Sequence, residues 1–99
     1  MIIYGDNDDN YASFLRATKD VKTVISSMTK EELLLLYSLY KQSMFGDNKT
    51  SQPSLFDIKG KAKWNSWMLQ AGKEKPAARK EYVDYVNMLL NRNKQNVSI

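Results

Sequence analysis

The side chains best suited to bind a ligand are a group of aromatic and basic residues. Tyr37, Tyr40 and Lys41 share one stripe of a segment that has the period of an α-helix. Two phenol rings and an ammonium group suit a ligand with both a flat ring and a phosphate, because aromatic rings stack on a base and lysine neutralises a phosphate. Basic charge is also concentrated in residues 59–80, which contain seven bases and one acid and carry +6, whereas the whole chain carries +4. This distribution predicts an anionic partner: a nucleic acid, a phosphate-bearing metabolite or an acidic membrane surface.

Catalytic and metal chemistry is not indicated by the composition. The 99 residues include no cysteine and no histidine, which excludes thiol nucleophiles, imidazole bases and zinc sites built from thiolates or imidazoles. No nucleophile is paired with a base by its spacing, and Glu31, Glu32 and Asp57 are expected to cap helices or to lie on the surface. We therefore expect a protein that is not an enzyme, with no catalytic residue, no metal and no cofactor.

The elements that must position these residues are all helical. Apolar residues recur at helical spacing in four segments, and no segment alternates as a strand would. Thr29 and Glu32 form a capping box before the second helix, and Pro53 lies in a long polar loop after it. A chain of this length forms one domain, so the pattern predicts a small all-α bundle. The four helices are expected at residues 10–26, 30–45, 59–70 and 75–92.

The second helix carries apolar residues on two faces. Leu33 shares a face with Tyr37, whereas Leu35, Leu36 and Leu39 lie largely on the other side. A surface helix needs one apolar face, so the second face is explained by cover on both sides or by an apolar ligand. Two rival functions stay open at this point: a basic helical module that binds single-stranded nucleic acid, and a module that docks an amphipathic partner helix. The core is expected to contain the leucines of this helix with Phe14, Trp64 and Trp67.

Residues 37–67 resemble the signature of one known family. They read YSLYKQSMFGDNKTSQPSLFDIKGKAKWNSW, which is similar to the pattern of acyl-CoA-binding proteins: Y-x-x-Y-K-Q, then G-D, then a loop proline, then D-x-K-G-K-A-K-W-x-x-W. The likeness extends from Phe14 to Leu89 without apparent gaps. It implies a four-helix up-down-down-up bundle that binds medium- to long-chain fatty acyl-CoA esters without chemistry.

The resemblance also implies the residues of the binding site. The 3′-phosphate of the nucleotide would lie between Lys41 and Lys63, and the acyl chain in a groove between the second and third helices. Leu33 stands where relatives often have methionine, and Thr18 where they often have alanine, so the chain-length preference is open. The implied ligand-binding residues are Lys22, Tyr37, Tyr40, Lys41, Lys59, Lys63 and Tyr82. The implied lining of the acyl and adenine pockets is Ala17, Thr18, Val21, Leu33 and Leu34.

The domain organisation and cellular setting are expectations of the same kind. Residues 1–10 are expected to form a flexible extension, residues 11–91 the binding domain and residues 92–99 a polar tail. The N-terminus has no features of a targeting segment, and the longest aliphatic run, Leu33–Leu36, is too short to span a bilayer. We expect a cytoplasmic monomer that carries and pools acyl-CoA, meets acyl-CoA-using enzymes and, transiently, membrane surfaces, and binds no nucleic acid.

Overall fold

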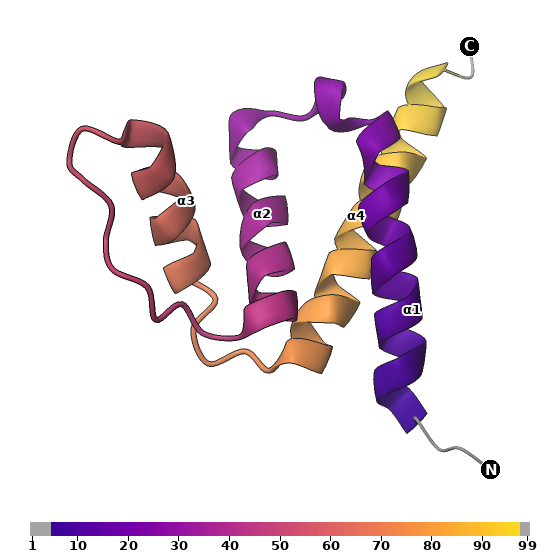
Figure 1. Cartoon of the computed structure of the whole chain (residues 1–99). Coiled ribbons are helices and arrows are strands. Elements are labelled where there is room, and N and C mark those ends of the chain that lie inside the picture. Colours follow the sequence, from indigo (N-terminus) through magenta and orange to yellow (C-terminus); the bar gives the residue numbers. More distant parts are fainter. Residues whose placement is uncertain (1–4, 98–99) are drawn as a thin grey trace.

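The chain folds into four helices in a computed structural model that describes residues 5–97, with side chains described for residues 11–94. The helices are α1 (Gly5–Asp20), α2 (Lys30–Phe45), α3 (Ile58–Met68) and α4 (Lys75–Val97), and two short 3₁₀ helices, η1 (Val21–Thr23) and η2 (Ile25–Ser27), link α1 to α2. Residues 5–97 contain no strand. Figure 1 shows α1 and α4 running in one direction and α2 and α3 in the other, which confirms the predicted up-down-down-up bundle.

The helix bounds agree with the prediction for α2 and differ for the other three. Helix α1 begins at Gly5 and α4 ends at Val97, so helix extends into both segments that were predicted as an extension and a tail. Residues 1–4 and 98–99 of those segments lie outside the described residues. Helix α3 begins one residue earlier than predicted, at Ile58, and ends at Met68 instead of residue 70.

The predicted helix over residues 10–26 is wrong at its C-terminal end, because the α-helix stops at Asp20. The next residues include a β-branched run, which lowers helix propensity. Two hydroxyls also bond to backbone carbonyls three residues back: Thr23 Oγ1 donates to the Asp20 carbonyl at 2.9 Å, and Ser27 Oγ donates to the Val24 carbonyl at 2.8 Å. The tighter 3₁₀ turns change the faces on which these side chains lie.

The capping box at the start of α2 is present. The Glu32 N–H donates to Thr29 Oγ1 at 3.1 Å, and the Thr29 N–H donates to Glu32 Oε1 at 2.9 Å. Both oxygens of the Glu32 carboxylate also accept from the Arg92 guanidinium, at 2.5 and 3.1 Å. These hydrogen bonds lower the pKa of Glu32 from 4.5 to about 2, with the Arg92 bond as the largest cause. The box therefore fixes the start of α2 and ties it to the end of α4.

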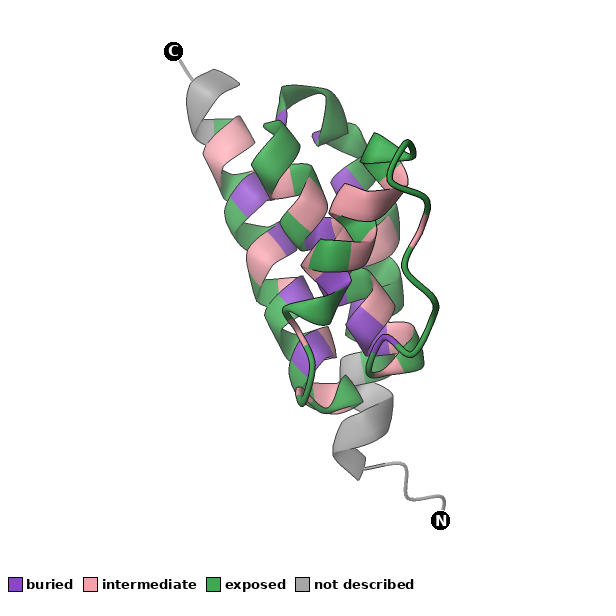
Figure 2. Cartoon of the chain, turned by 90° about the vertical axis from the view of Figure 1, so that its left-hand side faces the viewer, coloured by how far each residue is buried: buried purple, intermediate pink, exposed green. Residues whose placement is uncertain are grey.

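The hydrophobic core lies where α4 packs against α1 and α2, while α3 packs on the other side of α2. Figure 2 shows the buried residues along the faces that the helices turn toward one another. Trp67 is buried as predicted, but the core prediction for Trp64 is wrong: its indole is half-buried, and Nε1 donates to the Thr50 carbonyl at 3.1 Å. Trp64 therefore holds the long loop against α3. The core cluster consists of Phe14, Ala17, Val21, Val24, Met28, Leu36, Leu39, Tyr82, Val86 and Leu89.

A polar cluster around the buried Gln42 closes the end of the bundle where α2 ends and α4 begins. This cluster is here called the Gln42 hub, and it contains Gln42, Asp47, Trp67, Gly72 and the Lys73 carbonyl. Gln42 has no exposed surface, and its Nε2 donates to Asp47 Oδ1 at 2.9 Å and to the Lys73 carbonyl at 2.7 Å. Its Oε1 accepts from Trp67 Nε1 at 3.2 Å. Asp47 Oδ1 also accepts from the N–H of Gly72, which has φ 91°. Hydrogen bonds from Gly72 and then Gln42 lower the pKa of Asp47. The hub joins α2, α3 and the α3–α4 turn.

Candidate ligand-binding site

A groove of about 410 Å³ opens between α2, α4 and the stretch that links α1 to α2. Val21 and Leu36 are buried and give the groove an apolar floor, while Lys22 and Tyr40 are exposed at its rim. An apolar floor with a basic, phenolic rim suits an amphipathic anion. The groove is lined by Thr18, Val21, Lys22, Ile25, Leu33, Leu36, Tyr37, Tyr40 and Tyr82.

Aromatic rings from three helices meet at the α4 side of this groove. Phe14 is fully buried, and its ring stacks on Tyr40 with centroids 5.9 Å apart and meets the edge of Tyr82 at 5.0 Å. Tyr11 also stacks on Phe14, with centroids 6.4 Å apart, and the Arg79 guanidinium lies 5.1 Å from the Tyr11 centroid. Side chains one helical turn apart on α1 therefore continue the aromatic surface of α2 and α4.

Tyr82 is the most buried of the groove tyrosines, with 3% of its surface exposed. Burial raises the pKa of Tyr82 to about 12, and the nearby Tyr40 phenol contributes in the same direction. The phenol is therefore neutral at physiological pH and keeps its O–H as a hydrogen-bond donor.

Two lysines from different helices converge on the ring of Tyr37. Lys41 Nζ lies 5.9 Å from the Tyr37 centroid and Lys63 Nζ lies 5.5 Å from it. Lys41 Nζ also lies 4.5 Å from the ring centroid of Phe45 and 4.8 Å from that of Trp67. Aromatic faces hold an ammonium group without accepting conventional hydrogen bonds, so the N–H donors stay free to bind an anion.

No carboxylate among the described side chains, residues 11–94, forms an ion pair with the lysines of this site. The ion pairs found there join Lys73 to Glu81, Lys80 to Asp84 and Arg92 to Glu32, all away from Tyr37. Two ammonium groups that lie against one ring, with no described carboxylate as counter-ion, create a positive potential. A phosphate is well matched to such a pair, because its oxygens accept hydrogen bonds from both.

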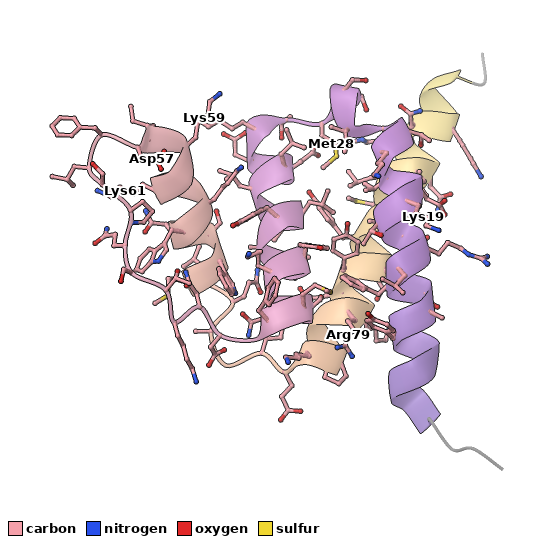
Figure 3. All side chains as sticks on the ribbon, in the orientation of Figure 1. Lys19, Met28, Asp57, Lys59, Lys61 and Arg79 are labelled. Atoms are coloured by element: carbon pink, nitrogen blue, oxygen red, sulfur yellow. The ribbon has the colours of Figure 1, made fainter. Side chains whose placement is uncertain are left out.

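Helix α3 positions Lys63 through an N-terminal cap. Asp57 Oδ1 accepts from the N–H of Gly60 at 2.9 Å, which satisfies one of the free donors at the helix start. A methyl group at residue 60 would overlap the Asp57 carboxylate, so the glycine in this basic run makes room for the cap. Figure 3 shows Asp57, Lys59 and Lys61 together at this end of α3.

A second, more apolar groove of about 260 Å³ runs between α2 and α3. Leu34 and Leu35 line it from α2, and Leu69 lines it from the C-terminal end of α3. Ser38 Oγ accepts from Gln70 Nε2 at 3.0 Å at its floor, so the polar atoms there are already paired. This groove lies where the resemblance places an acyl chain.

The structure gathers most of the predicted site residues, and it separates two of them from the rest. Lys41 and Lys63 meet at Tyr37, and Leu34 lies in the second groove. Ala17, which is 6% exposed, lines a different groove between α1 and α4. Lys59 is exposed and, unlike Lys41 and Lys63, lies against none of the described aromatic rings. The seven predicted residues that line the first groove are Thr18, Val21, Lys22, Leu33, Tyr37, Tyr40 and Tyr82.

Two residues that line the first groove, Ile25 and Leu36, were not predicted as site residues from the sequence. Ile25 belongs to the segment predicted as one continuous helix over residues 10–26, but the 3₁₀ turns after Asp20 bring it to the groove. Leu36 was assigned to the core and in fact does both, because it is buried and also lines the groove. The β-branched run around Ile25 was the available signal for the end of α1.

The described residues form neither a metal site nor a membrane-spanning helix. The described carboxylates form no cluster that could hold a metal ion, and Glu32 and Asp57 are occupied as helix caps, as predicted. None of the described helices combines the length and the hydropathy needed to cross a bilayer.

The family follows from comparison with known proteins. A family model described as "Acyl CoA binding protein" matches residues 11–86. The chain belongs to the acyl-CoA-binding protein family. This confirms the identification made from residues 37–67. The family is one of binding proteins and not of enzymes.

Individual members of the acyl-CoA-binding protein family resemble about four fifths of the chain. An acyl-CoA-binding protein homolog of Drosophila melanogaster is 44% identical over 77 residues, which cover 78% of this chain and 90% of the relative. Acyl-CoA-binding protein homolog 1 of Caenorhabditis elegans is 47% identical over 78 residues, covering 79% and 91%.

Solved structures of this family share the fold. The crystal structure of acyl-CoA-binding protein 2 of Oryza sativa is 32% identical and superposes with a TM-score of 0.87, covering 90% of this chain and 99% of that one. The acyl-CoA-binding protein of Moniliophthora perniciosa is also 32% identical, with a TM-score of 0.76 and coverages of 83% and 81%. The four-helix fold predicted from the sequence is therefore that of the family.

Proposed function

We propose that this chain binds medium- to long-chain fatty acyl-CoA esters, one per protein, with no chemical step. The observation that carries the proposal is the pair of lysines, Lys41 and Lys63, whose ammonium groups lie against the ring of Tyr37 without a described carboxylate partner. This pair borders a groove whose floor is apolar and whose rim is phenolic. A phosphorylated nucleotide joined to an alkyl chain is the ligand that uses both parts.

Each part of the site has a role in this proposal. Lys41 and Lys63 bind the 3′-phosphate, and Tyr37 and Tyr82 donate phenolic hydrogen bonds. The ring of Tyr40 stacks beside the adenine. Lys22 adds charge at the groove rim, and Lys59 is a peripheral contact that attracts the anion from outside the groove. Thr18, Val21 and Leu33 set the shape of the adenine and acyl pockets, and Leu34 borders the acyl chain from α2. Ala17 lines the groove between α1 and α4 and has no direct contact with the ligand in this proposal.

Both halves of the ligand must contribute to the affinity. CoA carries about four negative charges, which residues 59–80 with their charge of +6 attract. Burying a chain of about sixteen carbons at ~0.8 kcal/mol per methylene gives roughly 12 kcal/mol before ordering costs. A nanomolar complex needs about 12 kcal/mol net, so the alkyl chain alone does not suffice.

Isothermal titration with palmitoyl-CoA below its micelle concentration tests this function. We expect a one-to-one isotherm with submicromolar affinity, much weaker binding of free CoA, and almost no binding of palmitate. Equal affinity for CoA and palmitoyl-CoA would contradict the two-part site. Release of free thiol from palmitoyl-CoA would contradict binding without chemistry.

The rival function for the same residues is the binding of single-stranded nucleic acid. Tyr37, Tyr40 and the lysines have the side chains for stacking and charge neutralisation on a single strand. The groove floor is apolar, however, which suits an alkyl chain and not a sugar-phosphate backbone. Tight binding of single-stranded DNA in a gel shift at physiological salt would favour the rival.

The cellular role that follows from the proposed binding is that of a carrier. A monomeric cytoplasmic protein that encloses an acyl-CoA ester keeps a pool of it in solution and delivers it to the enzymes that use it. The expected exchange with membranes follows from the ligand, because an ester with a long alkyl chain partitions into bilayers.

A further inference from the structure

The turn that leads into α3, together with the first residue of α3, exposes three apolar side chains within four residues of the sequence. Leu55 is 73% exposed, Phe56 is 92% exposed and Ile58 is 74% exposed. The groove leucines of α2 are far more covered, since Leu33 is 37% exposed. These three residues are here called the α3 tip. They belong neither to the core nor to the lining of the two grooves that form the proposed site.

The α3 tip is held by its own hydrogen bonds. The Phe56 N–H donates to Ser54 Oγ at 3.1 Å, and the Asp57 N–H donates to the Ser54 carbonyl at 3.0 Å. Asp57 then caps α3 through Gly60. These hydrogen bonds hold the backbone from Ser54 to the helix, so binding requires little ordering of the backbone at the α3 tip.

Two lysines adjoin the α3 tip. Lys59 and Lys61 follow it directly in the first turn of α3, and Figure 3 shows both beside Asp57 at this end of the helix. The carboxylate of Asp57, the only acid between residues 50 and 73, accepts the Gly60 N–H of its own helix end. Apolar side chains flanked by lysines match a surface that is apolar below and negatively charged above.

We propose that the α3 tip docks this protein on anionic lipid bilayers, with Leu55, Phe56 and Ile58 inserted among the acyl chains and Lys59 and Lys61 at the headgroups. The proposal builds on the proposed function only in that acyl-CoA esters partition into such bilayers, and it is tested without them. Full burial of the three side chains would remove roughly 500 Å² from water. A stable protein interface needs about 800 Å² from each partner, so a bilayer fits this small protruding patch better than a protein or a second copy does.

Sedimentation with lipid vesicles tests the α3 tip. The full-length, ligand-free chain is mixed with vesicles of phosphatidylcholine, either pure or mixed with phosphatidylserine. We expect binding to the mixed vesicles that weakens as salt rises. The double variant Leu55→Gln/Phe56→Gln should bind them at least about tenfold more weakly, because two inserted side chains are lost.

Two further variants separate the apolar and the charged contributions. Met88→Gln, at a 48% exposed residue on α4 outside the α3 tip, removes a similar apolar side chain and should bind mixed vesicles like the original chain. Lys61→Gln should weaken binding to mixed vesicles about fivefold and leave binding to pure phosphatidylcholine unchanged.

The outcomes distinguish this proposal from the proposed function. Titration with palmitoyl-CoA in the absence of vesicles should give the double variant an unchanged affinity, and circular dichroism should show unchanged helix. Absence of binding to mixed vesicles by the original chain, or equal binding by the double variant, overturns the docking proposal while leaving ligand binding intact. A concentration-dependent dimer that the double variant abolishes, with no vesicle binding, assigns the α3 tip to self-association and also overturns it.

Discussion

Lys41 and Gln42 are neighbours on α2, yet their polar atoms are in opposite situations. Gln42 is fully buried, and its amide is bonded to Asp47, Lys73 and Trp67. Lys41 lies over aromatic rings and pairs with none of the described carboxylates. A buried polar group that is satisfied within the chain stabilises the fold, whereas a cation left without a counter-ion is available to a ligand. The difference separates the structural end of the bundle from its binding side.

Gln42→Leu should have the largest effect, on stability. The substitution removes three hydrogen bonds of the buried amide, to the Lys73 carbonyl, to Asp47 and from Trp67, and at about 1 kcal/mol for each bond we expect a loss of roughly 3 kcal/mol in the free energy of unfolding. Urea denaturation measures it. Gln52→Leu, the same change at an exposed loop residue, should cost almost nothing. If folded Gln42→Leu protein binds palmitoyl-CoA with unchanged affinity, Gln42 serves the fold and not the ligand. A large loss of affinity would contradict this separation of structural and binding residues.

Lys41→Ala should give the next largest effect, on binding. Loss of one ammonium group from the Lys41–Lys63 pair should weaken palmitoyl-CoA about 30-fold, which corresponds to the ~2 kcal/mol typical of a truncated charge pair. The midpoint of thermal unfolding should move little, since Lys41 forms no ion pair with any described carboxylate. Lys80→Ala, which breaks the exposed pair with Asp84, is the matched control and should leave the titration unchanged. An affinity of Lys41→Ala equal to that of the original chain would reject the phosphate assignment.

Tyr82→Phe should produce a smaller loss of affinity. Removing the phenolic O–H takes away one hydrogen bond to the ligand, and we expect about a tenfold weaker palmitoyl-CoA complex. Because burial raises the pKa of Tyr82 to about 12, the contribution of its O–H should not change between neutral and mildly alkaline pH. Tyr85→Phe provides the contrast. Its hydroxyl donates to the Glu32 carbonyl at 3.3 Å, so this change should affect stability and not binding. Equal affinities for the two variants would remove Tyr82 from the site.

Glu32→Gln should have the smallest effect, visible in the pH dependence of stability. The pKa of Glu32 falls from 4.5 to about 2 in the folded chain, so its contribution is complete above pH 4.5 and is lost as the pH falls towards 2. Thermal unfolding between these limits should therefore depend less on pH in Glu32→Gln than in the original chain. Glu31→Gln, at the exposed neighbouring residue, serves as the control. The same pH slope in all three proteins would show that the Arg92 pair does not contribute to stability.

The sequence by itself determined the parts of this protein that depend on local pattern. Helix α2 begins and ends at the predicted residues because Thr29 and Glu32 form its capping box and Gly46, with φ 77°, ends it. The family identification from residues 37–67 was also available from the sequence, since the motif combines residue types with fixed spacing. These features are encoded within a few turns of chain.

Only the tertiary structure decided which side chains meet. Lys63 reaches the ring of Tyr37 because α3 packs against α2, whereas Lys59, one turn earlier on the same helix, lies against none of the described aromatic rings. Ala17 lines the α1–α4 side, and Ile25 reaches the groove after α1 stops at Asp20. A helical period assigns residues to faces, but the crossing of the helices and the point where each one ends decide which neighbour a face meets. That choice depends on packing free energy summed over the whole bundle, which no local pattern contains.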